Sequence, residues 1–331
     1  ITISSIDRLV FYAILMCAVA LIVRFTYGIY CKRHFEECMY HFIFDKNLLK
    51  GMFGFAGWNF IGASSSVLRD QGGNVVINLF CGPAVNAARG IAFQVNNAVN
   101  GFVVNFMMAL NPQITKQYAA GNREYMMTLI FQGARLSFYM LLLLSLPILV
   151  NTHYVLGLWL KIVPEHAVSF VQLVLVFAMS ESISQPLVTA MLATGKIRNY
   201  QLVVGGLQMM NLPVSYVLLR MGAVPETVLI VAMAISQCCL AARLLMLRGM
   251  IGLSVRLYLK KVYTNVLMVS FISMAVPILF VSHMDETFLD FVVSCAVTVV
   301  CTGFTIYYVG CNRTERKFVV EKIHKIARKQ R

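Results

Sequence analysis

The sequence predicts an all-α fold, a polytopic membrane bundle of about nine transmembrane helices. Hydrophobic residues fill 59% of its 331 positions and charged residues only 13%, whereas soluble domains average about 25% charged residues. Apolar runs of roughly 20 residues recur along the chain, and each could cross the ~30 Å hydrocarbon core as a helix. Because these runs are continuously apolar, helices are favoured over a membrane barrel, whose strands alternate over about 10 residues.

The apolar runs give the expected order of the helices. They cover residues 9–31, 46–80, 84–111, 125–150, 165–192, 199–220, 223–247, 261–282 and 286–309. The run from Leu9 to Cys31, with Arg24 near one end, is arranged like the run from Val228 to Arg248 with Arg243. We therefore expect residues 1–45 to hold the last helix of an otherwise missing first lobe, followed by a cytoplasmic linker.

The rest of the chain divides into three expected parts. Residues 46–247 would form one complete six-helix lobe, residues 248–311 two additional transmembrane helices, and residues 312–331 a basic cytoplasmic tail. Transporters are commonly built from two structural repeats with the substrate site near the membrane midplane between them. One repeat with flanking helices would therefore supply one wall of such a site.

The positive charge predicts the orientation of the chain. If residue 1 starts outside and the helices alternate, most of the 28 Lys and Arg residues, Arg243 and the tail among them, fall on one side. Basic residues concentrate in cytoplasmic loops, so we expect a cytoplasmic C-terminus and no nucleic-acid partner. The nine cysteines show no CxxC pair and mostly fall within apolar runs, which predicts neither a disulfide nor a metal site. No cofactor is expected.

The neighbouring segments 46–80 and 84–111 are unusually polar for membrane helices. They carry a set of charged and amide side chains: Arg69, Asp70, Asn74, Asn78, Asn86, Arg89, Asn96, Asn97 and Asn100. A charged side chain at the bilayer centre costs on the order of 2.5–3.5 kcal/mol on the insertion scale, so both segments should face a protein interior or a watery cavity. The amides would bind sugar hydroxyls there, and the planar guanidinium groups would attract phosphate. Asparagines that only bond one helix to the next remain an alternative.

A break between the two polar segments is expected at Gly82-Pro83, because Pro cannot continue helical hydrogen bonding. The segment 46–80 is also too long for a straight crossing at 1.5 Å per residue. Gly72-Gly73 is therefore a candidate bend, although close packing against a neighbouring helix would explain these glycines as well.

Residues equally far from the break should lie at similar depth if the two helices run antiparallel. Asp70 then lies level with Asn96, and Arg89 has Asn78 nearby. Side chains at adjacent positions of a helix diverge, so we expect Arg69 not to pair with Asp70. Arg69 would be the charge without a partner.

A carboxylate within the segment 165–192 is a candidate for ion coupling. Glu181 is followed by Pro186, and an isolated membrane carboxylate can bind and release a proton or Na⁺. Asp70 is the second candidate for this role. A hydrogen-bonded glutamate packed between helices is an equally open interpretation of Glu181.

Several stretches carry a resemblance to a known family. They are Phe55-Ala-Gly-Trp-Asn-Phe-Ile-Gly62, Gly82-Pro-Ala-Val-Asn-Ala-Ala-Arg-Gly-Ile-Ala-Phe-Gln-Val-Asn96, Ala109-Leu-Asn-Pro-Gln-Ile114 and Ala193-Thr-Gly-Lys-Ile197. Through them the chain resembles the multidrug, oligosaccharidyl-lipid and polysaccharide exporter superfamily. Within it, the chain is most similar to lipopolysaccharide or O-antigen flippases of Bacteroides-like bacteria.

The resemblance implies a V-shaped pair of six-helix lobes that opens alternately to the two sides of the bacterial inner membrane. Such proteins carry a lipid-linked oligosaccharide, attached through a polyprenyl pyrophosphate, to the outer leaflet for polysaccharide or lipopolysaccharide biosynthesis. Membrane lipids and a coupling ion, H⁺ or Na⁺, would be the other partners. Since the chain lacks nearly all of the first lobe of that family, the transport expectation applies to the intact protein.

Two other functions are alternatives to a flippase. A drug and cation antiporter of the same superfamily should favour acids and aromatic faces in its cavity, whereas this chain offers two arginines and many amides. A membrane glycan polymerase should present paired carboxylates, but the acids of the predicted outer loops, Glu165, Glu226, Asp285 and Glu286, are scattered over separate loops. We therefore expect no enzyme and no catalytic residues.

Overall fold

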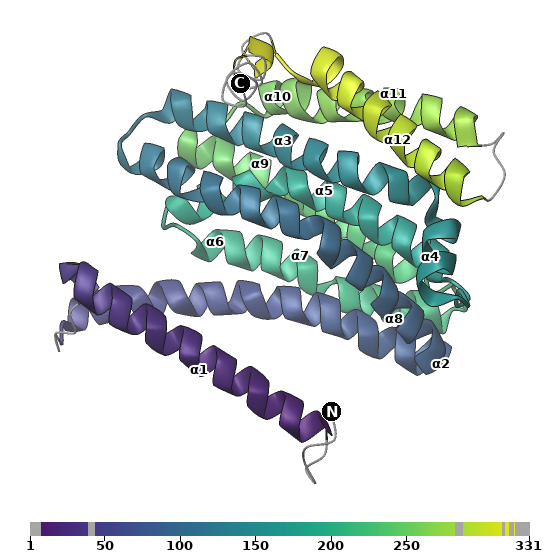
Figure 1. Cartoon of the computed structure of the whole chain (residues 1–331). Helices are drawn as coiled ribbons and strands as arrows, with labels where there is room; N and C mark the ends of the chain where they lie inside the picture. Colours follow the sequence, from purple (N-terminus) through teal and green to yellow (C-terminus); the bar gives the residue numbers. More distant parts are fainter. Residues whose placement is uncertain (1–7, 39–43, 282–286, 313–314, 318–320, 322–331) are drawn as a thin grey trace. The chain divides into compact units, whose positions relative to one another are not determined.

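The computed structural model describes residues 8–38, 44–281, 287–312, 315–317 and 321, and all regular structure in these ranges is helical (Figure 1). The chain forms two compact units that meet in the sequence between Phe53 and Gly54. The predicted all-α class is therefore confirmed for the described residues. The finer division into four parts stays a prediction, and most of the tail 312–331 lies outside the described residues.

Eight helices of the described chain are long and apolar enough to cross a membrane. They are Val10–His34, Leu49–Ala119, Arg123–Val150, Ala167–Ala193, Arg198–Arg220, Thr227–Ile251, Val255–Leu279 and Phe288–Gly310. This pattern is that of a multi-pass membrane protein. The second of these helices is 71 residues long and covers both predicted segments 46–80 and 84–111 except for residues 46–48, so the number of separate crossings stays a prediction.

The first unit contains α1 (Arg8–His34), η1 (Glu36–Cys38) and the start of α2 (Lys46–Ala119). α1 is apolar around most of its length, with Arg24 as the exception, and its last turn carries Lys32, Arg33 and His34. An all-round apolar helix is typical of a membrane span. Basic residues in the last turn also interact favourably with the negative end of the helix dipole.

α2 is broken at Gly82, as the sequence predicted. Gly82 has a φ of 84° and a ψ of 173°, a region of backbone space that is essentially restricted to glycine. Pro83 follows directly and begins the second stretch of helix. We call Lys46–Cys81 the first arm of α2 and Pro83–Ala119 the second arm.

The bend expected at Gly72-Gly73 is not observed, because both residues keep helical dihedral angles. Close packing explains them instead. A Cβ atom on Gly72 would lie 2.5 Å from Leu212 Cδ1, and one on Gly73 would lie 3.0 Å from Arg89 Nη2. The two glycines therefore let a neighbouring helix and the second arm approach the first arm closely.

The core of the second unit is formed by three long helices and the second arm of α2. α3 (Arg123–Val150) packs against α5 (Ala167–Ala193), and α5 packs against α9 (Thr227–Ile251) (Figure 1). α11 (Thr264–Val281) and α12 (Phe288–Thr305) pack on each other, and both contact α3. The shorter elements are α4 (Thr152–Leu160), α6 (Arg198–Tyr200), η2 (Gln201–Gly205), α7 (Gly206–Met209), α8 (Asn211–Arg220), α10 (Val255–Tyr258), η3 (Leu259–Tyr263) and η4 (Ile306–Gly310).

A buried ion pair ties α3 to the segment after α12. Arg135 is 4% exposed, pairs with Glu315 and donates to the Gly310 carbonyl oxygen at 3.4 Å. Tyr139 donates to the same carbonyl at 3.3 Å, and a Cβ on Gly310 would lie 2.9 Å from its ring. Arg135 is thereby compensated within the protein, which indicates a structural role.

We expect Gly82→Ala to lower the free energy of unfolding by about 1–3 kcal/mol, because alanine is strained in the backbone conformation of Gly82. Gly90→Ala is the matched control on the same helix. It has ordinary helical dihedrals and open space for a Cβ, so alanine should be neutral or stabilise by up to ~1 kcal/mol. Thermal unfolding of the purified protein in detergent measures both effects. Equal midpoints for the two variants would show that the break does not need glycine.

Candidate functional site

Two cavities lie beside the first arm of α2, in the second unit. The large cavity, of about 500 Å³, is lined by both arms of α2 and by α5. The small cavity, of about 330 Å³, is lined by the first arm, α5, the segment from α6 to α7, and α9. Arg69, Glu181 and Gln185 line both cavities. These three side chains therefore mark the wall that the two cavities share.

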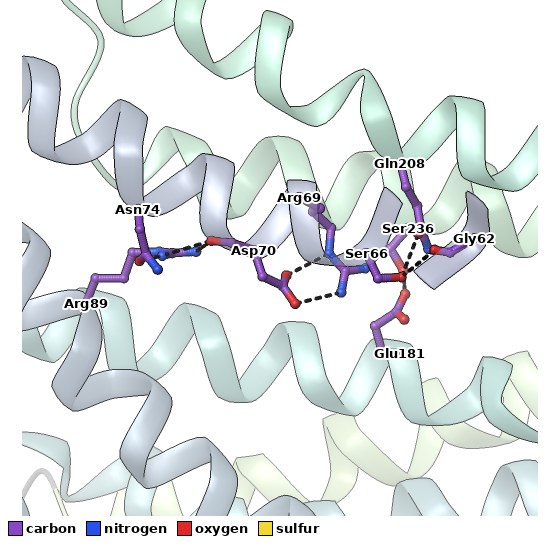
Figure 2. A network of polar contacts seen from close by, with 9 residues as sticks. All are labelled: Gly62, Ser66, Arg69, Asp70, Asn74, Arg89, Glu181, Gln208 and Ser236. Carbon is purple, nitrogen blue, oxygen red and sulfur yellow. Dashed lines mark hydrogen bonds and ion pairs between the residues drawn. The ribbon is translucent and has the colours of Figure 1, made fainter. Parts of the chain in front are cut away.

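Arg69 pairs with Asp70, which corrects the expectation that adjacent residues would diverge. Arg69 Nε lies 2.9 Å from Asp70 Oδ1, and Nη2 lies 3.4 Å from Oδ2 (Figure 2). The Arg69 guanidinium also lies over the Phe177 ring of α5, 5.6 Å from its centroid. The Cβ vectors of adjacent residues do diverge on a helix, but the long arginine side chain reaches around the helix to the neighbouring carboxylate. Arg69 is therefore not the charge without a partner.

Arg89 joins the two arms of α2, but through a different partner than expected. It is 3% exposed and donates to Asn74 Oδ1 and to the Asp70 carbonyl oxygen (Figure 2). Asn78, the expected neighbour, is exposed. The physical reason is the space at Gly73, where a Cβ would lie only 3.0 Å from Arg89 Nη2. The guanidinium enters this space and bonds to Asn74, one turn of helix before the expected partner Asn78.

The structure brings part of the predicted amide set together at the large cavity. Asn96, Asn97 and Asn100 line it, and so does Asn111, which the sequence interpretation quoted only as part of a motif. Asn111 accepts a hydrogen bond from Thr189 of α5 at 2.7 Å. Within the described residues, the buried Asn96 Oδ1 has no hydrogen-bond donor.

The other predicted amides do not line either cavity. Asn74 is bonded to Arg89 and donates to Gln71 Oε1 at 3.1 Å. Asn86 is half-buried. The structure therefore separates the amides of the second arm that line the large cavity from the amides that connect or flank the two arms.

Glu181 lies in the shared wall and is hydrogen-bonded to a neighbouring helix. Ser236 of α9 donates to its carboxylate (Figure 2), and one residue earlier Ser180 bonds to Gln237 of α9. These contacts form a polar seam between α5 and α9. The interpretation of Glu181 as a glutamate hydrogen-bonded between helices is thus observed, and its role in ion coupling stays a prediction.

On the small-cavity side, Ser66 connects the first arm to α7. Its hydroxyl lies 3.1 Å from Gln208 Oε1 and 3.3 Å from the Gly62 carbonyl oxygen (Figure 2). A Cβ on Gly62 would lie 2.1 Å from Gln201 Oε1. The small size of residue 62 therefore makes room for an amide at the edge of the small cavity.

Arg243 is a site residue that the sequence interpretation misplaced. The charge count assigned it to the cytoplasmic side with the loop arginines, but it lies inside α9, is 3% exposed and lines the small cavity. The charge count grouped it with the loop arginines although residue 243 lies within the predicted span 223–247, and α9 continues further, to Ile251. The signal that could have placed it is its position within the apolar run 228–248.

The acids of the predicted outer loops are less scattered than expected. Glu226 Oε1 lies 2.6 Å from His166 Nδ1, and Glu165 lies 3.9 Å from the other ring nitrogen. His166 and Glu226 are the residues that precede α5 and α9, so their contact joins the starts of two core helices. Asp285 and Glu286 lie outside the described residues.

The fold and the two cavities define a multi-pass helical membrane protein with a polar interior. No protein-family model, characterised protein or solved structure matches the chain. The likeness to the exporter superfamily therefore stays a prediction from the quoted sequence stretches. The function has to be argued from the geometry of the cavities.

The Arg69–Asp70 pair can be tested with a double-mutant cycle. We expect Arg69→Gln and Asp70→Asn each to destabilise the protein, and the double variant to lose less than their sum. The coupling should be about 0.5–1 kcal/mol, at the low end for contacting residues because Asp70 is partly exposed to water.

Unfolding of the purified protein in mixed detergent micelles measures the coupling. Combining Arg69→Gln with Asn78→Ala supplies the control, since Asn78 is exposed on the same arm and has no described bond to Arg69. Additive effects in both cycles would contradict the pair.

Proposed function

We propose that this protein exports a lipid-linked oligosaccharide across the bacterial inner membrane by alternating access, with a cytoplasmic C-terminus. The observation that carries the proposal is the amide lining of the large cavity. Asn96, Asn97, Asn100, Asn111 and Gln185 face it. A carboxamide offers both donors and acceptors, which suits the mixed hydrogen bonding of sugar hydroxyls.

The large cavity also has an apolar side. Val103, Val104, Met107 and Met108 of the second arm line it together with Phe93. Methionine side chains adapt to irregular apolar surfaces. An amphipathic cargo with a sugar head and a lipid chain would meet both kinds of lining in one cavity.

A phosphate group of the cargo would meet Arg69 at the shared wall. Asp70 engages Nε and Nη2 of Arg69, and no described acceptor engages Nη1. Arginine can therefore hold Asp70 and present a further donor to a phosphate oxygen. Arg89 does not line the cavity and supports this site indirectly, through the Asp70 carbonyl and Asn74.

Ion coupling would act through the carboxylates of the same wall. Asp70 and Glu181 both line the large cavity, and Glu181 also lines the small one. Binding of H⁺ or Na⁺ to either carboxylate would change the charge that faces Arg69. That change is a means of linking an ion gradient to the affinity for an anionic cargo.

A cation antiporter is the second candidate, because two aromatic rings and two acids line the large cavity. A cationic ligand would bind over such ring faces. However, Arg69 lies over Phe177 and Arg89 over Phe93. The chain's own guanidinium groups thus cover one face of each ring, which favours the flippase.

The proposal predicts that proteoliposomes containing the intact protein move a fluorescent polyprenyl-pyrophosphate oligosaccharide between leaflets. The double variant Asn96→Ala/Asn100→Ala should slow this movement by about tenfold or more, because each lost buried hydrogen bond to cargo is worth about 0.5–1.5 kcal/mol. Loss of probe fluorescence to a membrane-impermeant quencher measures the rate.

Gln172→Ala is the control, since this exposed amide lies outside both cavities and only approaches the Leu149 carbonyl at 3.5 Å. Movement of a fluorescent cationic dye, with no movement of the oligosaccharide lipid, would contradict the flippase and support the antiporter. Equal rates of lipid movement in the cavity variant and the wild type would show that these amides do not bind the cargo.

A further inference from the structure

Arg243 is a buried cation with unused hydrogen-bond donors. It is 3% exposed in the wall of the small cavity, and its Nε and Nη1 have no acceptor within the described part of the chain. A buried charge without a partner is strongly unfavourable, whereas a charge that is paired and hydrogen-bonded is tolerated. The small cavity is therefore a place where an anion would stabilise the protein.

The carboxylate that lines the small cavity does not pair with Arg243. Glu181 is the one carboxylate among the described residues that line the small cavity, and no ion pair joins it to Arg243 there. Its carboxylate is bonded to Ser236 instead. Arg69 also lines the cavity but is paired with Asp70, so Arg243 is the cation in the described lining that has no acidic partner.

Neutral donors surround the same space. Gln201 and Gln208 are both 8% exposed and line the cavity together with Asn59, Ser66 and Tyr200. Because Gln208 Oε1 accepts from Ser66 at 3.1 Å, its NH₂ group is left as the donor. An anion at Arg243 would thus be met by guanidinium and amide hydrogens from α9, α7 and η2.

We propose that the small cavity binds a phosphate monoester group, held by Arg243 with help from Gln201 and Gln208. A phosphate offers three strong acceptor oxygens, and the planar guanidinium matches two of them at once. The volume of about 330 Å³ is within the range of small-ligand sites, so the group can carry a substituent. It belongs to a lipid headgroup or to a soluble phosphate compound. Because Arg243 does not line the proposed cargo cavity, the phosphate site can be tested independently of the transport proposal.

The two sources are separated by two binding experiments on the purified full chain. In the first, thermal unfolding in detergent is followed with inorganic phosphate against chloride at equal ionic strength. In the second, unfolding is compared between nanodiscs of phosphatidylcholine alone and nanodiscs that also contain phosphatidic acid. A rise of the midpoint with phosphate identifies a soluble ligand, and a rise with phosphatidic acid alone identifies a lipid headgroup.

Arg243→Gln should weaken the binding of the effective probe by at least about tenfold, because it removes a charge-assisted, desolvated contact. Arg248→Gln on the same helix is the matched control. Arg248 is exposed and should leave the affinity unchanged. Glu181→Gln removes a negative charge from the cavity and should keep or increase the affinity.

Three results would overturn the site. They are no stabilisation by either probe, equal affinity in Arg243→Gln and wild type, or equal losses in Arg243→Gln and Glu181→Gln, which would mean that the two residues pair with each other. If Arg243→Gln does not fold, Gly62→Ala replaces it. Its new Cβ would displace the flexible Gln201 amide without touching Arg243, so several-fold weaker binding is expected and unchanged binding contradicts the proposal.

Discussion

The structure depends on the need to compensate charged side chains inside apolar helices. A charge placed in the hydrocarbon core is expensive unless it meets a partner or a polar cavity. The first arm of α2 satisfies this need within one turn and a half of helix. Asp70 holds Arg69 through its carboxylate and Arg89 through its backbone carbonyl, so a single residue position serves both arginines. The shared wall of the two cavities is built around it.

Two glycines make this arrangement sterically possible. Gly82 takes a backbone conformation in which the chain leaves the first arm and begins the second. Gly73 leaves the space that the Arg89 guanidinium enters. Because Arg89 bonds to the first arm from the second, the charge compensation also fixes how the two arms pack. The amide stripe of the second arm then faces α5 across the large cavity.

The helices and the position of the break could be predicted from the sequence, because both follow from local chemistry. Continuous apolar runs define membrane helices, and Gly82-Pro83 ends a run of helical hydrogen bonds. The polar wall could also be predicted from the asparagines of the second arm. Partners of long side chains could not, since Arg69 reaches its own neighbour and Arg89 fills a space that is visible only once the arms are packed. Arg243 lies within the predicted span 223–247, but the sequence alone does not show that this part of α9 is buried beside a cavity.

We expect the cavity beside Arg69 to be a watery space within a membrane bundle. Reaction of single cysteines with a water-soluble maleimide in native membranes, in a chain whose nine cysteines are replaced, tests it most directly. Asn100→Cys, in the lining of the large cavity, should react with the maleimide. Leu245→Cys should not react, because Leu245 is 62% exposed on the outer face of α9 and would contact lipid. Protection of position 100 equal to that of position 245 would contradict the account.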